Sequence, residues 1–369
     1  MGGNEKSVQL KLFVDRQKRK VVFAEAEKDF VDILFSFFTL PMGTIARLST
    51  KMGNMKLGSL SSLYKSVMNL DVEHFCTYAC KDLLLNPSNV SSSIFHKLKV
   101  NLHDTNPIGA SISGSHDDGV FVKNGTSFII TDDLKFSNLL NLSLLTNNPL
   151  TNLVFGGREL CLRSSLSCST NSTSSNSAFM SKISSQPRTM KILVQKSKKK
   201  VLCAQVDDSF VELLFSFLIF RLGVVRHLTM DNSSPAGIHN LLNSVLSLGE
   251  GKYLKSEDVE SILLGPKLVL SDLHVINSPL TSDVNIRSVG FLKEQATFIV
   301  SDDLQVTVST SISMISKFNK DGIPVGDMEV VEVSVGEPEA LLMLKDFLTS
   351  TSVLTDCLTV FTKKRKVES

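Results

Sequence analysis

The sequence has 369 residues, a length that predicts two or three domains, each large enough to bury a hydrophobic core. Hydrophobic residues make up 42% and charged residues 21%, and these globular values exclude a chain that is disordered throughout. The 39 Lys and Arg residues nearly balance the 37 Asp and Glu residues, so the net charge of +2 provides no overall field to attract polyanions.

The cysteines and the apolar stretches indicate an intracellular protein. The six cysteines are too scattered for the dense disulfide framework of a small secreted domain, so we expect reduced thiols. The N-terminal region is charged and has no uninterrupted apolar stretch, which argues against a signal peptide. The two most apolar runs, 33–42 and 213–225, are shorter than the roughly 20 residues that cross a bilayer. We therefore expect a cytoplasmic or nuclear protein with no membrane partner.

Taken in chain order, the first predicted element is a β-hairpin. Residues 8–14 and 21–26 have strand-like patterns, and the basic segment 15–20 between them forms the tip. Residues 30–40 (FVDILFSFFTL) predict a helix, with Asp29 as its N-cap and 41–43 (PMG) as its stop signal.

Two further helices are predicted near 58–70 and 72–85. The second would carry His74, Cys76 and Cys80, and the spacing of the two cysteines places them on one helical face, as in half of a metal site. No second ligand pair has a matching spacing, and Cys is among the most buried residue types, so packing in the core is the preferred interpretation.

The later part of each half contains patterns that predict further strands and a helix. Asn124-Gly125 predicts a type I′ turn between strands at 120–123 and 126–130. An alternating pattern over 305–313 predicts a strand, and the apolar spacing over 337–350 predicts a helix.

These elements occur twice, in the same order. Residues 30–48 and 210–228 are identical at eight of nineteen positions and lie 180 residues apart. Further on, 120–134 matches 290–304, and both stretches end in Asp-Asp-Leu. Such collinear similarity indicates an internal repeat.

The repeat predicts an α+β fold with two tandem homologous modules, each a small antiparallel sheet with packed helices. Module 1 spans 7–160 and module 2 spans 188–362. Residues 161–187 between them are rich in Ser, Thr and Asn, which is typical of a flexible linker, and 363–369 form a basic C-terminal tail.

Three stretches, 30–48, 63–87 and 119–134, together with their repetition, resemble the plant domain-of-unknown-function family 674. The resemblance extends over nearly the whole chain. It implies no established chemistry, cofactor or catalytic residue.

The candidate chemical groups are two carboxylate pairs, Asp132-Asp133 and Asp302-Asp303, which follow equivalent predicted strands. Paired carboxylates can bind a divalent ion or share acid and base roles. The simpler interpretation is that each pair ends a strand and caps the next segment. No Gly-rich phosphate loop, nucleophile elbow or zinc-protease motif occurs, so we predict no catalytic residue and no cofactor.

Basic clusters suggest a second kind of site. The hairpin tips at 16–20 and 196–200 could contact phosphate in a salt-dependent way, or they could be solvated turns that protect strand edges. A candidate nuclear-import signal, which could equally be a solubilising tail, consists of Lys363, Lys364, Arg365 and Lys366.

We therefore expect a non-catalytic binding or scaffold protein whose partner is another protein. Two alternatives stay open at this point. One is an enzyme of unrecognised type that uses the Asp-Asp pairs, and the other is a weak nucleic-acid binder that uses the basic hairpins and tail.

Overall fold

The structure, a computed structural model, confirms the predicted α+β class. It combines α-helices with two antiparallel sheets, one of three strands and one of five. The residues that the structure describes are 8–51, 57–87, 98, 120–124, 127–131, 188–229, 236–250, 253–256, 258–264, 290–293, 297–308 and 311–358.

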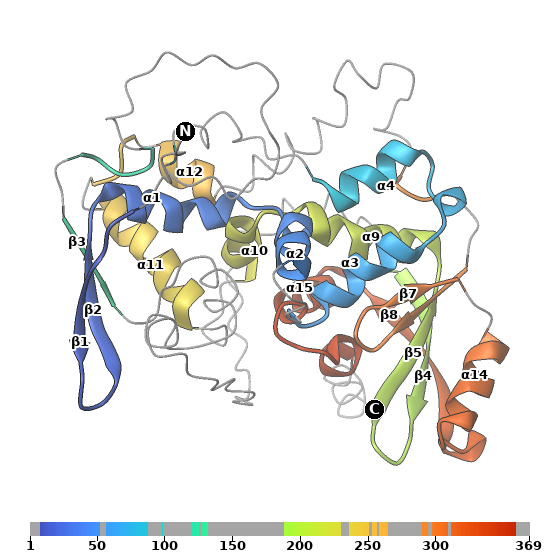
Figure 1. The fold of residues 1–369 in the computed structure, drawn as a ribbon. Coiled ribbons are helices and arrows are strands. Elements are labelled where there is room, and N and C mark those ends of the chain that lie inside the picture. The colour runs from blue at the N-terminus through green and yellow to red at the C-terminus, as the bar shows by residue number, and fades with distance from the viewer. Residues whose placement is uncertain are drawn as a thin grey trace, which may run out of the picture. The chain divides into compact units, whose positions relative to one another are not determined.

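The chain forms two compact units, and each unit takes segments from both copies of the repeat. The first unit consists of Met1–Leu40, Asn89–Ser167 and Arg221–Ser271. The second unit consists of Pro41–Ser88, Cys168–Phe220 and Asp272–Ser369. In Figure 1, blue N-terminal elements accordingly share the first unit with yellow elements from the middle of the chain.

The first unit is built on the three-stranded sheet, in the order β1-β2-β3. The elements from copy 1 are β1 (Lys11–Asp15), β2 (Lys20–Ala26), α1 (Lys28–Ser36), the 3-10 helix η1 (Phe37–Thr39) and β3 (Phe128–Thr131). The elements from copy 2 are α10 (Leu222–Thr229), α11 (Ala236–Glu250) and α12 (Asp258–Leu264). Helix α11 packs on α1, and α10 and α12 pack on η1, so helices of copy 2 complete the core of copy 1.

The second unit is built on the five-stranded sheet, in the order β7-β6-β5-β4-β8. Its strands are β4 (Arg188–Gln195), β5 (Lys200–Val206), β6 (Phe298–Ser301), β7 (Val306–Thr307) and β8 (Met328–Val335). The helices from copy 2 are α9 (Asp208–Ile219), α14 (Ser311–Lys320), η5 (Val325–Asp327) and α15 (Glu337–Asp346). The helices from copy 1 are α2 (Met42–Lys51), α3 (Leu60–Asn69), η2 (Val72–His74) and α4 (Tyr78–Leu85). Helices α2, α3 and α4 pack on α9, which reverses the exchange seen in the first unit.

The chain passes between the units five times, and two of these joints lie in the described residues, at Leu40–Pro41 and at Phe220–Arg221, at equivalent positions of the repeat. Leu40 and Phe220 are both extended, with φ −73° and ψ 127° for Leu40 and φ −62° and ψ 137° for Phe220. After Leu40, Pro41 has no N–H to continue a helical hydrogen-bond ladder. Because each joint is short and extended, the following helix cannot fold back on the helix before it, a geometry that favours exchange between repeats.

Short backbone bridges confirm the exchange within each unit. In the second unit, Phe75 of copy 1 pairs with Leu292 of copy 2, and in the first unit Val122 of copy 1 pairs with Leu254 of copy 2. The flanking hydrogen bonds are Cys76 N to Phe291 O at 2.9 Å, Lys293 N to His74 O at 3.0 Å, Lys255 N to Phe121 O at 2.9 Å and Lys123 N to Tyr253 O at 3.0 Å. The same interaction is therefore made twice, each time between the two copies.

Local predictions from the sequence were confirmed for the hairpins. β1 and β2 pair with the same register and the same bulge as β4 and β5. At both tips one basic residue adopts a positive φ, 48° for Arg19 and 50° for Lys199.

Several predicted boundaries were wrong. Helix α1 begins at Lys28 after Glu27, so Asp29 is not its N-cap. The region predicted as a helix over 72–85 is broken, because Phe75 is extended and pairs with Leu292.

The later strand predictions also need correction. The strand expected over 305–313 is limited to β7, because a helix starts at Ser311. Val122 pairs with Leu254, and β3 pairs with β2, so 120–123 and β3 do not form a hairpin; Gly125 in the expected turn lies outside the described residues. The linker at 161–187 also lies outside them, so the module boundaries stay a prediction.

The exchange predicts that neither half of the chain folds alone. Fragments 1–175 and 176–369, expressed together, should be recovered as a 1:1 complex, because each supplies the helices that the other's sheet needs. Size-exclusion chromatography with light scattering measures the stoichiometry. Expressed singly, each half should aggregate or self-associate, and a stable folded monomer of either half would contradict the exchange.

Candidate functional sites

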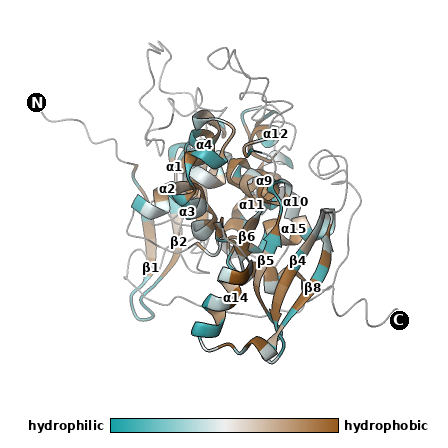
Figure 2. Ribbon diagram, turned by 90° about the vertical axis from the view of Figure 1, so that its right-hand side faces the viewer, coloured by the Kyte–Doolittle hydropathy of each residue, from teal (hydrophilic) through white to brown (hydrophobic). Residues whose placement is uncertain are grey.

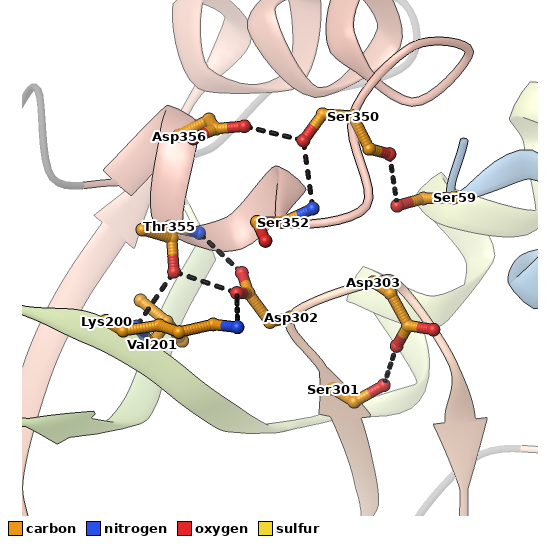
Figure 3. Close-up of polar contacts among 10 residues, drawn as sticks. All are labelled: Ser59, Lys200, Val201, Ser301, Asp302, Asp303, Ser350, Ser352, Thr355 and Asp356. Atoms are coloured by element: carbon orange, nitrogen blue, oxygen red, sulfur yellow. Dashed lines mark hydrogen bonds and ion pairs between the residues drawn. The ribbon is translucent and has the colours of Figure 1, made fainter. Parts of the chain in front are cut away.

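The Asp-Asp pair of copy 2 lies in the turn between β6 and β7. Leu304 has φ 62° and its N–H donates to Ser301 O at 2.9 Å, which closes a tight turn around Asp302 and Asp303. Figure 3 shows that the two carboxylates point to different sides of this turn. They are therefore not arranged to hold one ion between them.

Asp302 is 7% exposed, and its carboxylate caps the helical turn at 353–358. It accepts hydrogen bonds from Thr355 N at 2.8 Å and Thr355 Oγ1 at 3.0 Å, and Lys200 Nζ lies 3.6 Å away (Figure 3). Burial raises the pKa of Asp302, against these hydrogen bonds and the Lys200 charge, which lower it. Asp302 is thus fully engaged in holding one helix end.

The carboxylate of Asp303 is also engaged. It accepts hydrogen bonds from Ser301 Oγ at 2.5 Å and from Ser62 Oγ at 2.7 Å. The next serine on the same face of α3, Ser66, accepts a hydrogen bond from Val306 N at 2.8 Å. The turn of copy 2 is therefore fixed against helix α3 of copy 1.

These contacts favour the structural interpretation of the Asp-Asp pair. Within the described ranges, no three His, Cys, Asp or Glu residues come together as they would around a metal ion. The equivalent pair Asp132-Asp133 and the tail residues 363–366 lie outside the described residues.

Replacing Asp302 by Ala should destabilise the protein by about 2–4 kcal/mol, because it leaves the Thr355 donors without their buried acceptor. Urea denaturation measures the change. The exposed Asp321→Ala variant is the control and should stay within about 0.5 kcal/mol of the wild type. Unchanged stability together with a loss of divalent-metal binding in Asp302→Ala would instead support the metal alternative.

Each unit also contains a largely buried carboxylate, Asp32 in the first unit and Glu212 in the second. The sequence analysis did not identify either residue as a functional group. Asp32 in α1 is 2% exposed and accepts hydrogen bonds from three successive backbone N–H groups. These donors are Val120 N at 2.7 Å, Phe121 N at 2.8 Å and Val122 N at 3.0 Å. Burial raises the pKa of Asp32, while these hydrogen bonds lower it. Asp32 thereby shapes the segment that pairs with Leu254.

Glu212 in α9 accepts equivalent backbone hydrogen bonds in the second unit. Its carboxylate accepts hydrogen bonds from the backbone of Phe291 and from Leu292 N, the latter at 2.5 Å, and burial raises its pKa. Glu is one methylene longer than Asp, and Gly290 stands where copy 1 has Val120. A Cβ on Gly290 would collide with the Glu212 carboxylate, so the longer acid requires the glycine. The two copies thus use two matched pairs.

The pairs Asp32–Val120 and Glu212–Gly290 predict that a second substitution can restore stability lost through the first. Gly290→Val should cost about 1–3 kcal/mol through the collision, and adding Glu212→Asp should recover much of that loss by recreating the pair of copy 1. A double-mutant cycle by urea denaturation measures the coupling. Purely additive losses would show that the two positions act independently.

The cysteines do not form the half-site that their spacing suggested. Cys76 is in the extended segment before α4, and its Sγ donates to Leu292 O at 2.9 Å. Cys80 is buried in α4, where Thr77 Oγ1 donates to its sulfur at 3.1 Å. Burial raises the pKa of the Cys203 thiol to about 11, which keeps it protonated and unreactive near neutral pH.

The most unusual surface is the outer face of the three-stranded sheet, which we call the open face and define by Phe13, Val22, Phe23 and Ile129. Phe13 is 37% exposed, Val22 is 53% exposed and Ile129 is 73% exposed. The opposite face of β2 and β3 is buried and includes Val21, Ala24, Ala26 and Ile130, whereas Leu12 and Val14 on β1 are 37% and 36% exposed. Figure 2 shows hydrophobic colour along β1 and β2, ending at a hydrophilic hairpin turn.

The equivalent face of the second unit is covered. Leu193, Leu202, Cys203 and Ile299 occupy the positions of the open-face residues, and all are less than 10% exposed. The residues packed against them are Met314, Ile315 and Phe318 of α14, Ile323, and Met328 of β8. The open face of the first unit is therefore in contact with solvent, whereas the equivalent face of the second unit is buried by residues of copy 2.

Comparison with protein families finds a match over most of the chain. The family described as "Protein of unknown function (DUF674)" matches residues 4–110, 136–281 and 280–369. The chain belongs to this family. The match confirms the resemblance found in the sequence, and its three segments agree with a DUF674 protein of repeated modules. Comparisons with curated proteins and with solved structures find no match.

Two further properties of this DUF674 chain concern its surroundings. Among the helices that the structure describes, none is long and apolar enough to cross a membrane. The basic hairpin tips are exposed at Arg16 to Lys20 and at Lys196 to Lys200. At the first tip, Asp15 Oδ1 accepts hydrogen bonds from Gln17 N and Lys18 N, both at 3.0 Å, which hold the backbone of the turn.

Proposed function

We propose that this DUF674 protein is a non-catalytic binding protein, and that the open face of its first unit is the surface that contacts a protein partner. The observation that carries the proposal is the contrast between the two sheets. Ile129 is 73% exposed, whereas Ile299 at the equivalent position is 1% exposed.

The physical argument for a binding surface is that exposed apolar side chains gain free energy when a partner buries them. Full burial of a Val, Ile or Phe side chain contributes about 1.5–3 kcal/mol, so three neighbouring exposed side chains represent a substantial unused contribution to binding. Contiguous apolar patches on soluble proteins commonly mark interaction sites. Phe13 and Phe23 stack with ring centroids 4.2 Å apart, which gives the patch a defined aromatic centre.

A cytoplasmic or nuclear location is part of the proposal. It is supported by Cys80, Cys203 and Cys357, which form no disulfide in the described part of the chain, as expected in a reducing compartment. The basic residues 363–366 supply the candidate import signal.

Ile129→Glu should remove the partner without unfolding the protein, because a charge at the most exposed residue of the open face opposes apolar contact at a site that solvent already reaches. Tagged wild-type and variant proteins are used to capture partners from native extract, with and without nuclease, and retained proteins are identified by mass spectrometry. A protein retained by the wild type after nuclease treatment, and lost with Ile129→Glu, is the expected result.

Val330→Glu is the matched control. Val330 is a 61% exposed strand residue on β8 in the second unit, so its replacement makes a similar chemical change outside the open face. Equal loss of the partner in both variants would argue against a specific surface. Retention that depends wholly on nucleic acid would favour the nucleic-acid alternative.

A further inference from the structure

We propose that the open face and the free edge of β1 bind an extended strand of a partner protein in which apolar and acidic residues alternate, paired antiparallel to β1. The proposal rests on the binding function argued above and specifies the chemistry of the partner. It follows from what β8 does at the equivalent edge in the second unit.

Strand β8 shows how this kind of edge is filled. All eight of its residues pair antiparallel with β4, from Met328 opposite Gln195 to Val335 opposite Arg188. Its sequence, MEVVEVSV, alternates apolar with acidic or polar residues except at the adjacent Val330 and Val331. One acidic residue, Glu332, lies directly across from Lys191.

Strand β1 has the same geometry as β4 but no outer neighbour in the sheet that the structure describes. Lys11 pairs with Glu25 as Lys191 pairs with Gln205, and the bulges fall at equivalent positions. In the order β1-β2-β3, β1 is an edge strand, whereas β4 lies between β5 and β8. An exposed edge of this kind is a template for pairing with another strand.

The charges near β1 select an acidic partner. Lys11 occupies the position of Lys191, its side chain is 71% exposed, and its Nζ lies 3.1 Å from Glu25 and 5.2 Å from the Phe13 ring centroid. The adjoining hairpin tip adds four exposed basic residues, Arg16, Lys18, Arg19 and Lys20. A strand with Glu at the position of Glu332 would complement this surface as β8 complements β4.

The length of copy 1 indicates that the repeat does not supply such a strand itself. Leu150-Thr151-Asn152 corresponds in sequence to Leu354-Thr355-Asp356. Only 15 residues separate Leu134 from Leu150, whereas 49 separate the equivalent Leu304 from Leu354. The segment 311–335, which contains α14 and β8, therefore has no counterpart of similar length in copy 1. This difference favours a strand from another protein.

The test uses the protein's own strand as the probe. A fluorescein-labelled peptide with the sequence of residues 327–336, DMEVVEVSVG, is titrated with the full-length protein and followed by fluorescence anisotropy. We expect saturable binding that weakens at least tenfold with Phe13→Glu and is unchanged with Val308→Glu. Phe13 lies on β1 at the position of Leu193, which is directly opposite Val330 of β8. Val308 is 48% exposed next to β7, away from both β4 and β8, so this control tests a similar charge in the second unit. Equal melting temperatures exclude unfolding of the variants.

Two peptide variants test the mode of binding. Val331→Pro removes a backbone donor and should abolish strand pairing, while the double change of Glu329→Lys and Glu332→Lys should weaken binding and reverse its salt dependence. Absence of saturable binding, or binding that Phe13→Glu leaves intact, would overturn the strand proposal. A third outcome would also overturn the strand proposal: the protein self-associates, Ile129→Glu abolishes this self-association, and the peptide competes with it. The surface would then bind a second copy of the chain.

The outcomes separate the two proposals. If the peptide fails to bind but Ile129→Glu still releases a protein partner from native extract, the binding function stands and the strand mode is wrong. If neither effect occurs, the open face is not a binding surface.

Discussion

The two extended joints after η1 and α9 are the constraint on which the rest of the structure depends. The joint after η1 sends α2, α3 and α4 to the sheet of copy 2, and the joint after α9 sends α10, α11 and α12 to the sheet of copy 1, so each core is completed by the other copy. The bridges Phe75–Leu292 and Val122–Leu254 then fix both units in the same manner. Folding of either unit therefore requires the whole chain, and its contacts are of long range in sequence, which predicts slow folding.

Within this shared plan the copies have diverged by compensating changes. Asp32 beside Val120 and Glu212 beside Gly290 reach the same hydrogen-bonded arrangement with side chains of different length. Asp302, the most tempting catalytic candidate, is occupied by a helix end. The buried carboxylates of this protein consequently act on backbone donors, and their elevated pKa values are consequences of burial in a structural role.

The divergence of the two sheets has a different consequence. Copy 2 carries α14 and β8, which bury one sheet face and pair with one edge. The first unit presents the equivalent face and edge uncovered in the described part of the chain. A duplicated fold can acquire a binding surface in this way when one copy lacks a segment that the other contains. A strand from a partner protein can then take the place of the missing segment.

The sequence by itself determined the repeat, the two basic hairpins, the helical character of α1 and α9, and the α+β class, because these depend on local patterns and on comparison of one copy with the other. Only the tertiary structure decided which helices complete which sheet, what Asp302 contacts and which sheet face stays open. The physical reason is that the two copies present nearly the same interacting surfaces. Local sequence is equally compatible with helices that pack within a copy or across copies, and the joints and long-range contacts select the exchange.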